Sequence, residues 1–252
     1  MIGRSVVALG VAAALLLGDA AAARKPLPSL KMEDPCVRGA DRQRVVRFTA
    51  SDRTRLIGLA LGDGPRGVVM AHQGGGAPPN LCSWLPYARN LVGLGYHVLL
   101  LDHRGFGSSG TARTVANLKR VDRDVLAAVS VLRRRGARTV VLMGASLGGT
   151  AVVAAAAAAT PPVNGVVTLA AAESYVRIDG IAAARRLTVP ALFVAAERDF
   201  DFADQSRRLY EAAASADRQL LIVGGGEHGT PLLRDPSLAA RLEAFLARQS
   251  VH

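Results

Sequence analysis

The stretch from Val140 to Gly149 constrains the fold of this chain more than any other. Its first four residues are apolar and typical of a buried strand, and an alanine-rich stretch typical of a helix follows the sequence Gly-Ala-Ser-Leu-Gly-Gly. The strand therefore turns sharply into a helix, with Ser146 at the apex. Gly144 and Gly148 flank this serine because a side chain at either position would collide with the neighbouring strand or helix. The turn predicts a serine hydroxyl beyond the end of the sheet, beside the unpaired N–H groups of a helix N-terminus.

Strands and helices alternate along most of the chain. Two strands are predicted at 44–50 and 55–61, joined by a polar turn. Further short apolar strands are predicted at 67–71, 96–101, 139–143, 165–169, 191–195 and 219–223, with helices at 84–94, 115–135, 147–159, 178–187, 202–214 and 236–248. Strands this apolar are buried on both faces, which requires helices on either side of a parallel sheet. The predicted fold class is therefore α/β: a three-layer α/β/α sandwich, mostly parallel, with an antiparallel hairpin at its N-terminal edge.

The first 23 residues have the features of a secretory signal peptide. Arg4 supplies a positive charge, Val6 to Leu17 is an uninterrupted apolar run, and alanines at 20–23 offer small residues for cleavage. An uncleaved membrane anchor is the alternative, although the run is short for spanning and Asp19 interrupts it. We expect a signal peptide over 1–23, an extended arm over 24–43 and a single α/β domain over 44–252. The predicted location is the periplasm or the exterior, with no stable membrane insertion after cleavage.

The net charge of +11 bears on possible partners. A charge of this size predicts adhesion to anionic surfaces or a preference for anionic substrates, although an arginine-rich composition alone would also produce it. The chain has no interleaved aromatic and basic residues, zinc-ligand spacing or recognition helix. We therefore expect no nucleic-acid partner.

Both cysteines, Cys36 and Cys82, lie in the part of the chain expected to be exported. Cysteines in an oxidising compartment often pair. Such a bridge would join the N-terminal arm to the loop after the strand at 67–71. The sequence does not give the distance between them, so it leaves their pairing open.

Four segments resemble motifs of the α/β-hydrolase family, in the same order along the chain. Residues 144–148 resemble its nucleophile elbow, Gly-x-Ser-x-Gly, and residues 72–76 (His-Gln-Gly-Gly-Gly) its His-Gly-x-Gly loop. Residues 102–109 are similar to its Asp-x-Arg-Gly-x-Gly-x-Ser loop, which is mainly structural, and residues 224–229 to its glycine-flanked histidine. The resemblance covers about residues 44–250 and implies the α/β-hydrolase fold.

A serine hydroxyl is a poor nucleophile at neutral pH, so it needs a base to take its proton and an acid to orient that base. The family's chain order of Ser, Asp or Glu, then His implies Ser146 as nucleophile and Asp199 as acid. Asp201 is a rival acid and Glu197 a weaker one, because all three follow the strand at 191–195. The aspartate that is not the acid would cap the helix that begins near residue 202.

The resemblance implies His228 as the base, since the glycines before it let the loop fold back toward Ser146. The other four histidines are poorer candidates, because three precede the serine and lie beside strands and the fourth is at the chain end: His72, His97, His103 and His252.

The resemblance also implies an oxyanion hole formed by two backbone N–H groups. Leu147, directly after the nucleophile, would provide one. The other would come from the loop after the strand at 67–71, where Gln73 stands in place of the usual glycine. Either Gln73 or Gly74 could present this N–H, and we favour Gly74. The Gln73 side chain could also line the site or donate to the oxyanion.

These residues predict an exported serine hydrolase that cleaves esters, similar to a carboxylesterase and without a metal or organic cofactor. Only some twenty residues separate the strands at 165–169 and 191–195, where this family often inserts a lid. The site should therefore be open, which suits a small soluble ester or an exposed polymer. The same three residues would also serve a peptidase, thioesterase, lactonase or perhydrolase. A non-catalytic binding protein with this fold is the alternative of a different class.

Overall fold

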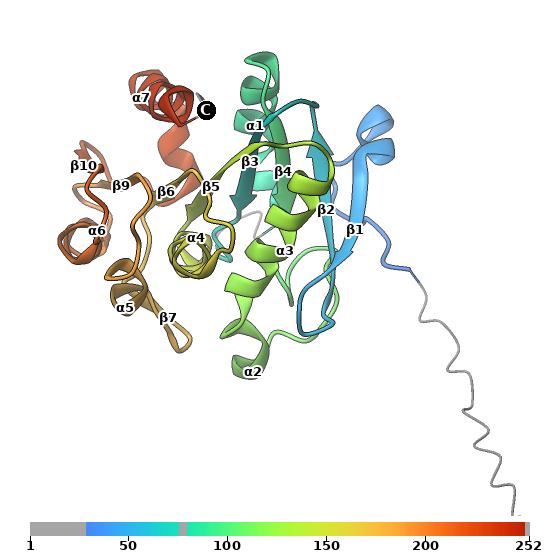
Figure 1. Cartoon of the computed structure of the whole chain (residues 1–252), viewed down its shortest axis with the longest axis horizontal. Helices are drawn as coiled ribbons and strands as arrows, with labels where there is room; N and C mark the ends of the chain where they lie inside the picture. Colours follow the sequence, from blue (N-terminus) through green and yellow to red (C-terminus); the bar gives the residue numbers. More distant parts are fainter. Residues whose placement is uncertain (1–28, 76–79, 250–252) are drawn as a thin grey trace, which may run out of the picture.

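The computed structural model describes residues 29–75 and 80–249. Its main sheet has eight strands in the order β1-β2-β4-β3-β5-β6-β9-β10 (Figure 1). The strands β1 and β2 form an antiparallel hairpin, β2 runs antiparallel to β4, and the remaining neighbours are parallel. The prediction of a mostly parallel sheet with an antiparallel N-terminal edge is confirmed. The strand bounds are β1 (Val45–Thr49), β2 (Arg55–Leu61), β3 (Arg66–Ala71), β4 (His97–Leu101), β5 (Thr139–Ala145), β6 (Gly165–Leu169), β9 (Ala191–Ala196) and β10 (Arg218–Val223).

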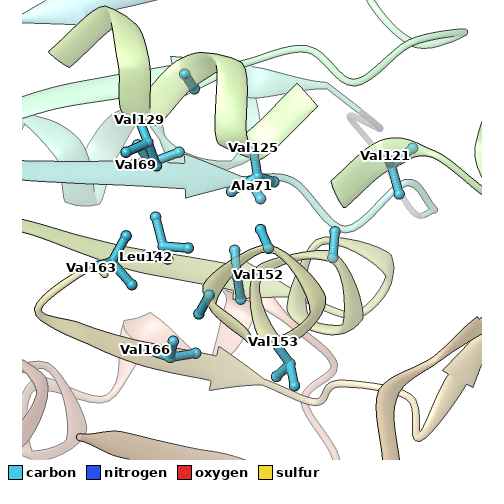
Figure 2. Close-up of a cluster of buried hydrophobic side chains, with 14 of the residues drawn as sticks. Val69, Ala71, Val121, Val125, Val129, Leu142, Val152, Val153, Val163 and Val166 are labelled. Carbon is cyan, nitrogen blue, oxygen red and sulfur yellow. The ribbon is translucent and has the colours of Figure 1, made fainter. Parts of the chain in front are cut away.

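Helices cover both faces of this sheet, as the apolar strands require (Figure 1). One face packs against α1 (Leu85–Gly93) and α7 (Pro236–Arg248), and the other against α3 (Val121–Arg134), α4 (Leu147–Ala158), α5 (Gly180–Ala184) and α6 (Phe202–Ala212). Figure 2 shows part of the hydrophobic cluster on the face covered by α3 to α6, in which Val69 and Leu142 of the sheet lie among valines of α3 and α4. Full burial of each such side chain contributes about 1.5–3 kcal/mol.

Two connections differ from the prediction. The helix expected over 115–135 is divided into α2 (Val115–Leu118) and α3, because Arg120, the N-cap of α3, leaves the helical conformation with φ and ψ angles of −125° and 17°. The helix expected over 178–187 begins later: a hairpin of β7 (Ser174–Tyr175) and β8 (Ile178–Asp179) precedes α5. Asp179 ends the hairpin and caps α5, since its carboxylate accepts a hydrogen bond from the N–H of Ala182 at 2.8 Å.

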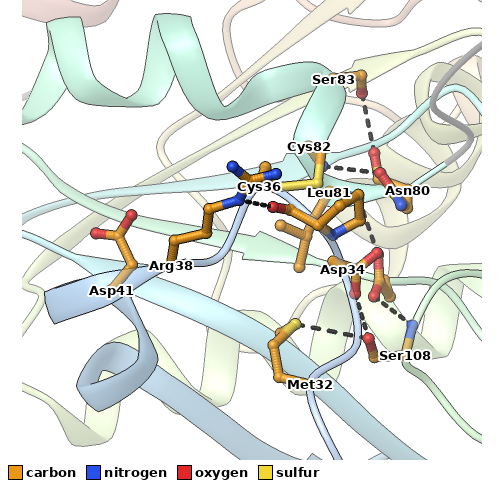
Figure 3. Close-up of a disulfide and its surroundings, with 12 residues drawn as sticks. Met32, Asp34, Cys36, Arg38, Asp41, Asn80, Leu81, Cys82, Ser83 and Ser108 are labelled. Atoms are coloured by element: carbon orange, nitrogen blue, oxygen red, sulfur yellow. Dashed lines mark hydrogen bonds between the residues drawn. A yellow bond between two sulfur atoms is a disulfide. The ribbon is translucent and has the colours of Figure 1, made fainter.

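The N-terminal arm is packed onto the domain and cross-linked to it. Met32 and Val37 are buried in the cluster beneath α1 and α7, and the arm ends in the short helix η1 (Gly39–Arg44). A disulfide joins Cys36 to Cys82 of η2 (Leu81–Trp84), with the two Cα atoms 5.7 Å apart (Figure 3). The pairing that the sequence left open is therefore present in the structure.

The predicted signal peptide, the start of the arm and His252 lie outside the described residues. Within the ranges 29–75 and 80–249, no helix has the length and apolarity needed to cross a membrane.

The sheet brings four loops to one edge. In a parallel sheet, the segments that follow the strands emerge at the carboxyl ends of those strands. Here the segments after β3, β5, β9 and β10 contain Gln73, Ser146, Asp199 and His228 respectively. The candidate site lies at this edge.

Candidate active site

Ser146 occupies a strained turn between β5 and α4. Its φ and ψ angles are 49° and −117°, a conformation that costs a non-glycine residue about 1–3 kcal/mol. A Cβ added to Gly148 would lie 2.2 Å from the carbonyl oxygen of Ala71, and one added to Gly144 would lie 2.2 Å from that of Gly148. Both glycines are therefore required by close backbone contacts, and the turn leaves Ser146 half-buried at the carboxyl edge of the sheet.

The loops after β9 and β10 bring a buried carboxylate against an imidazole. The Asp199 Oδ2 atom lies 2.7 Å from the His228 Nδ1 atom. The Asp199 side chain is 1% exposed and that of His228 is 33% exposed. With Nδ1 donating to the carboxylate, the His228 Nε2 atom is left to accept a proton. Burial raises the pKa of Asp199, and the hydrogen bond from His228 partly offsets this effect.

The rival acids make no such contact. Asp201 is exposed and occupies the N-cap position of α6, although its side chain makes no capping hydrogen bond, contrary to our expectation for the aspartate not used as acid. The Glu197 side chain is 65% exposed and lies 4.0 Å from Arg198. Of the three carboxylates, only that of Asp199 is paired with His228.

The loop that carries His228 also meets the turn that carries Ser146. Gly229, the next residue after His228, has a φ of 68°, and a Cβ added to it would lie 3.5 Å from the Cβ of Ala145. Ala145 directly precedes Ser146. The structure therefore brings the segments of the predicted nucleophile, acid and base to one corner of the sheet. The ring of Phe202, at the start of α6, packs 4.4 Å from the His228 ring.

The predicted oxyanion loop lies on the same corner. Leu147 is the first residue of α4, so its N–H has no acceptor within the helix. Gly74 has a φ of 71°, and a Cβ added to it would lie 3.1 Å from the Cδ1 atom of Leu147. The backbone nitrogen of Gln73 has no hydrogen-bond acceptor among the described residues.

His72 decides whether the N–H of Gly74 is available. The Gly74 nitrogen lies 3.0 Å from His72 Nδ1, and the His103 nitrogen lies 3.2 Å from His72 Nε2. Burial lowers the pKa of His72, so its ring is neutral. A neutral imidazole accepts at one nitrogen only, so it can bond one of these two N–H groups and not both. The choice between Gln73 and Gly74 as the second donor stays a prediction.

The Gln73 side chain makes a contact that the sequence did not predict. Its Oε1 atom accepts hydrogen bonds from the backbone N–H and the Oγ1 hydroxyl of Thr230, at 3.1 and 3.0 Å. The two residues are 157 positions apart. No local pattern could have indicated this pair, because it depends on how the two loops meet.

The loop at 102–109 holds its neighbours in place through buried charges. The Arg104 guanidinium binds Asp124 at 2.6 Å and Asp52 at 2.6 Å, and the Asp102 carboxylate accepts from the N–H groups of Leu81 and Ser108 at 2.8 and 2.7 Å. These contacts fit the structural role that the motif implied.

A cleft of about 470 Å³ opens beside the site, between α1 and the segment that leads into α7. Its walls include Gln73 and Thr230, but neither Ser146 nor His228 lines it. The remaining lining residues are Cys82, Ser83, Pro86, Tyr87, Asn90, Pro231, Leu233, Arg234 and Ala239. The cleft therefore borders the two loops that the Gln73–Thr230 contact joins, and not the predicted nucleophile. In the described part of the chain, no three His, Cys, Asp or Glu side chains gather closely enough to hold a metal ion.

Comparison with known families gives a match to part of the chain. Residues 64–179 match the family model described as serine aminopeptidase, S33. The matched segment is less than half of the chain; it includes Ser146 and ends before Asp199 and His228. No curated protein matches the chain in sequence.

Several solved structures share this fold. The esterase Pf2001 of Pyrococcus furiosus is 18% identical, with a TM-score of 0.71 over 82% of this chain and 92% of the other. The monoacylglycerol lipase of Paleococcus ferrophilus is 19% identical, with a TM-score of 0.62 over 77% and 98%. The enol-lactonase of Burkholderia xenovorans LB400 is 18% identical, with a TM-score of 0.63 over 80% and 100%. At these identities the likeness concerns the fold.

Proposed function

We propose that this chain is an exported serine hydrolase of the α/β-hydrolase family, which cleaves ester bonds through an acyl-enzyme. The observation that carries the proposal is the 2.7 Å contact between the buried Asp199 carboxylate and His228, at the corner where Ser146 lies. A buried carboxylate that orients an imidazole is the arrangement a serine nucleophile requires.

In the proposed mechanism, the Ser146 Oγ atom attacks the acyl carbonyl while His228 Nε2 takes the hydroxyl proton. The carbonyl oxygen becomes negatively charged, and the N–H of Leu147 with that of Gln73 or Gly74 stabilises it. His228 then gives its proton to the departing alcohol, which leaves the acyl group on Ser146. Water attacks this acyl-enzyme by the same route, and the released acid restores the free serine.

Asp199 supports both steps without entering the covalent chemistry. Its carboxylate accepts from His228 Nδ1, which leaves Nε2 unprotonated and able to accept the serine proton. When the imidazole takes the serine proton, the nearby negative charge stabilises the imidazolium. Because Asp199 is almost fully buried, water screens this interaction less than it would at an exposed site.

Two features favour small soluble esters or exposed polymer esters as substrates. The connection between β6 and β9 contains only the β7–β8 hairpin and α5, so no large insertion covers this edge. The structural neighbours named as an esterase, a monoacylglycerol lipase and an enol-lactonase support acyl esters, including cyclic ones, as the class of substrate.

A peptidase on the same residues is the second candidate, because the family model that matches residues 64–179 is described as a serine aminopeptidase. An amide substrate would use the same nucleophile and base, with an amine as the leaving group.

Kinetics on a matched substrate panel test these proposals. We expect turnover of p-nitrophenyl esters or a lactone, and little turnover of an aminoacyl p-nitroanilide. Ser146→Ala should lower kcat by roughly 10⁴–10⁶. Ser130→Ala is the matched control, since Ser130 lies on an exposed face of α3 and bonds only the carbonyl of Leu126. Equal ester turnover by wild type and Ser146→Ala would contradict the proposed function, and turnover of the anilide alone would favour the peptidase.

The proposed export has its own test. The Cys36–Cys82 disulfide suits an oxidising compartment. Mass spectrometry of the protein recovered outside the cytoplasm should find a new N-terminus after Ala22 or Ala23, and recovery of the intact chain only from the cytoplasm would contradict export.

A further inference from the structure

We propose that Gln73 is a positioning residue that clasps the oxyanion loop to the loop carrying the catalytic histidine. This inference rests on the serine-hydrolase function proposed above and extends it to a residue at which this chain departs from the family pattern. Where the usual motif has glycine, this chain has a side chain long enough to reach the other loop.

The contact is buried and converges on one atom. The Gln73 Oε1 atom accepts from the Thr230 N–H at 3.1 Å and from the Thr230 Oγ1 hydroxyl at 3.0 Å. Gln73 is 9% exposed and Thr230 is 8% exposed, so water competes little for these groups. Loss of the acceptor would leave two buried donors of Thr230 without a partner, which makes the clasp costly to open.

The residues around the clasp leave room for it. A Cβ added to Gly229 would lie 2.6 Å from the Gln73 Oε1 atom, so glycine at this position makes space for the carboxamide. On the other side of Gln73, a Cβ added to Gly74 would lie 3.1 Å from Leu147 Cδ1. The Gln73 side chain therefore lies against the residues that follow His228, while its neighbour Gly74 lies against Leu147, the first proposed oxyanion donor.

This placement gives the clasp a role in turnover rather than in substrate affinity. Oxyanion donors act only when they lie about 2.7–3.1 Å from the charged oxygen, and loss of one donor lowers turnover by about 10²–10³. Loosening the loop misplaces a donor without removing it, so the effect should be smaller. We expect kcat to fall by roughly tenfold with KM nearly unchanged, because an interaction made only in the transition state is weakened.

Three variants separate positioning from general stabilisation. Gln73→Met keeps the length of the side chain and removes the carboxamide, and Thr230→Val keeps the shape and removes the hydroxyl donor. Asn164→Ala is the matched control: its Oδ1 atom accepts from the N–H of Val140 at 2.9 Å, at the opposite end of β5. It removes the same kind of side-chain-to-backbone bond far from the candidate site.

The expected result is a tenfold lower kcat in Gln73→Met and a smaller loss in Thr230→Val. The double variant should match Gln73→Met within about a factor of two, because both substitutions break one contact. Asn164→Ala should keep the wild-type kcat. Wild-type kcat in a folded Gln73→Met protein, full multiplication of the two losses, or a raised KM with unchanged kcat would overturn the proposal.

Residue-resolved hydrogen exchange gives a test that needs no activity. Gln73→Met should accelerate exchange of the Thr230 amide, and Asn164→Ala that of Val140 instead. An unchanged Thr230 exchange rate would overturn the clasp even in an active enzyme. If wild type hydrolyses no substrate of the panel but Gln73→Met still accelerates exchange of the Thr230 amide, the contact is present and the proposed function is wrong. The role assigned to Gln73 in turnover is then overturned as well.

Discussion

The Cys36–Cys82 disulfide offers the stability prediction with the clearest magnitude. The bridged residues are 46 positions apart, so reducing the bond frees a long loop in the unfolded chain. The chain-entropy relation gives about 4 kcal/mol for a loop of this size. In a domain of this length, each kcal/mol lost from the free energy of unfolding lowers Tm by about 2–4 °C. Replacing both cysteines with serine should therefore lower Tm by about 8–16 °C.

The arm should remain docked in the folded variant, because other contacts hold it. Met32 and Val37 are buried at 8% and 1% exposure, and the N–H of Glu33 donates to the Ser108 hydroxyl at 2.8 Å. Asp34 also binds the Ser108 hydroxyl (Figure 3). Since these contacts survive reduction, the loss of stability should arise mainly in the unfolded state. Activity at 25 °C should be retained.

Thermal unfolding followed by circular dichroism provides the assay. Wild type should lose stability when treated with reductant and then match the Cys36→Ser/Cys82→Ser variant. Reductant should leave the variant itself unchanged, which controls for effects of the reagent. Two titratable thiols in untreated wild type, with the same Tm before and after reduction, would refute the reasoning.

Three further substitutions test the site and its turn. Asp199→Asn should lower kcat by about 10⁴. It should also raise Tm at neutral pH, because burial raises the pKa of the Asp199 carboxyl and its ionised form therefore lowers the stability of the wild type. This gain in Tm should shrink as the pH falls through the raised pKa toward the unfolded value of 3.8, where the carboxyl is protonated in both states. A pH series of melting curves checks the sign. Gly148→Ala should lower the free energy of unfolding by about 3 kcal/mol or more, because the added Cβ would lie 2.2 Å from the carbonyl oxygen of Ala71. Gly93→Ala is the control: its added Cβ has nothing within 4 Å, so denaturant titrations should give it a free energy of unfolding close to that of the wild type. Phe200→Gly should raise the free energy of unfolding by about 0.5 kcal/mol, because relief of the positive φ of 43° outweighs the added flexibility of glycine, and a side chain that is 92% exposed loses little burial. A lower free energy of unfolding in denaturant titrations would contradict this.

The sequence predicted those features that are written in local patterns. Apolar runs bounded by turns located the strands, and the glycines around Ser146 indicated the strained turn, because each signal lies within a few residues. The order of motifs implied Asp199 and His228, and the structure places these two side chains in contact. Their catalytic roles stay predictions.

Features that depend on contacts between distant segments could not be predicted in the same way. The helix expected over 115–135 breaks at Arg120, and Asp124 in the first turn of α3 binds Arg104 of the loop after β4. The pairing of Gln73 with Thr230 joins loops 157 positions apart. Neither contact leaves a periodic signal, because each depends on how elements pack after the sheet has formed.

Labelling with a fluorophosphonate, followed by mass-spectrometric mapping of the adduct, tests the central claim most directly. The proposed function predicts one modified site, Ser146, with labelling abolished in Ser146→Ala and strongly slowed in His228→Ala. A folded wild-type protein in which Ser146 stays unmodified, or in which His228→Ala labels at the wild-type rate, would contradict it.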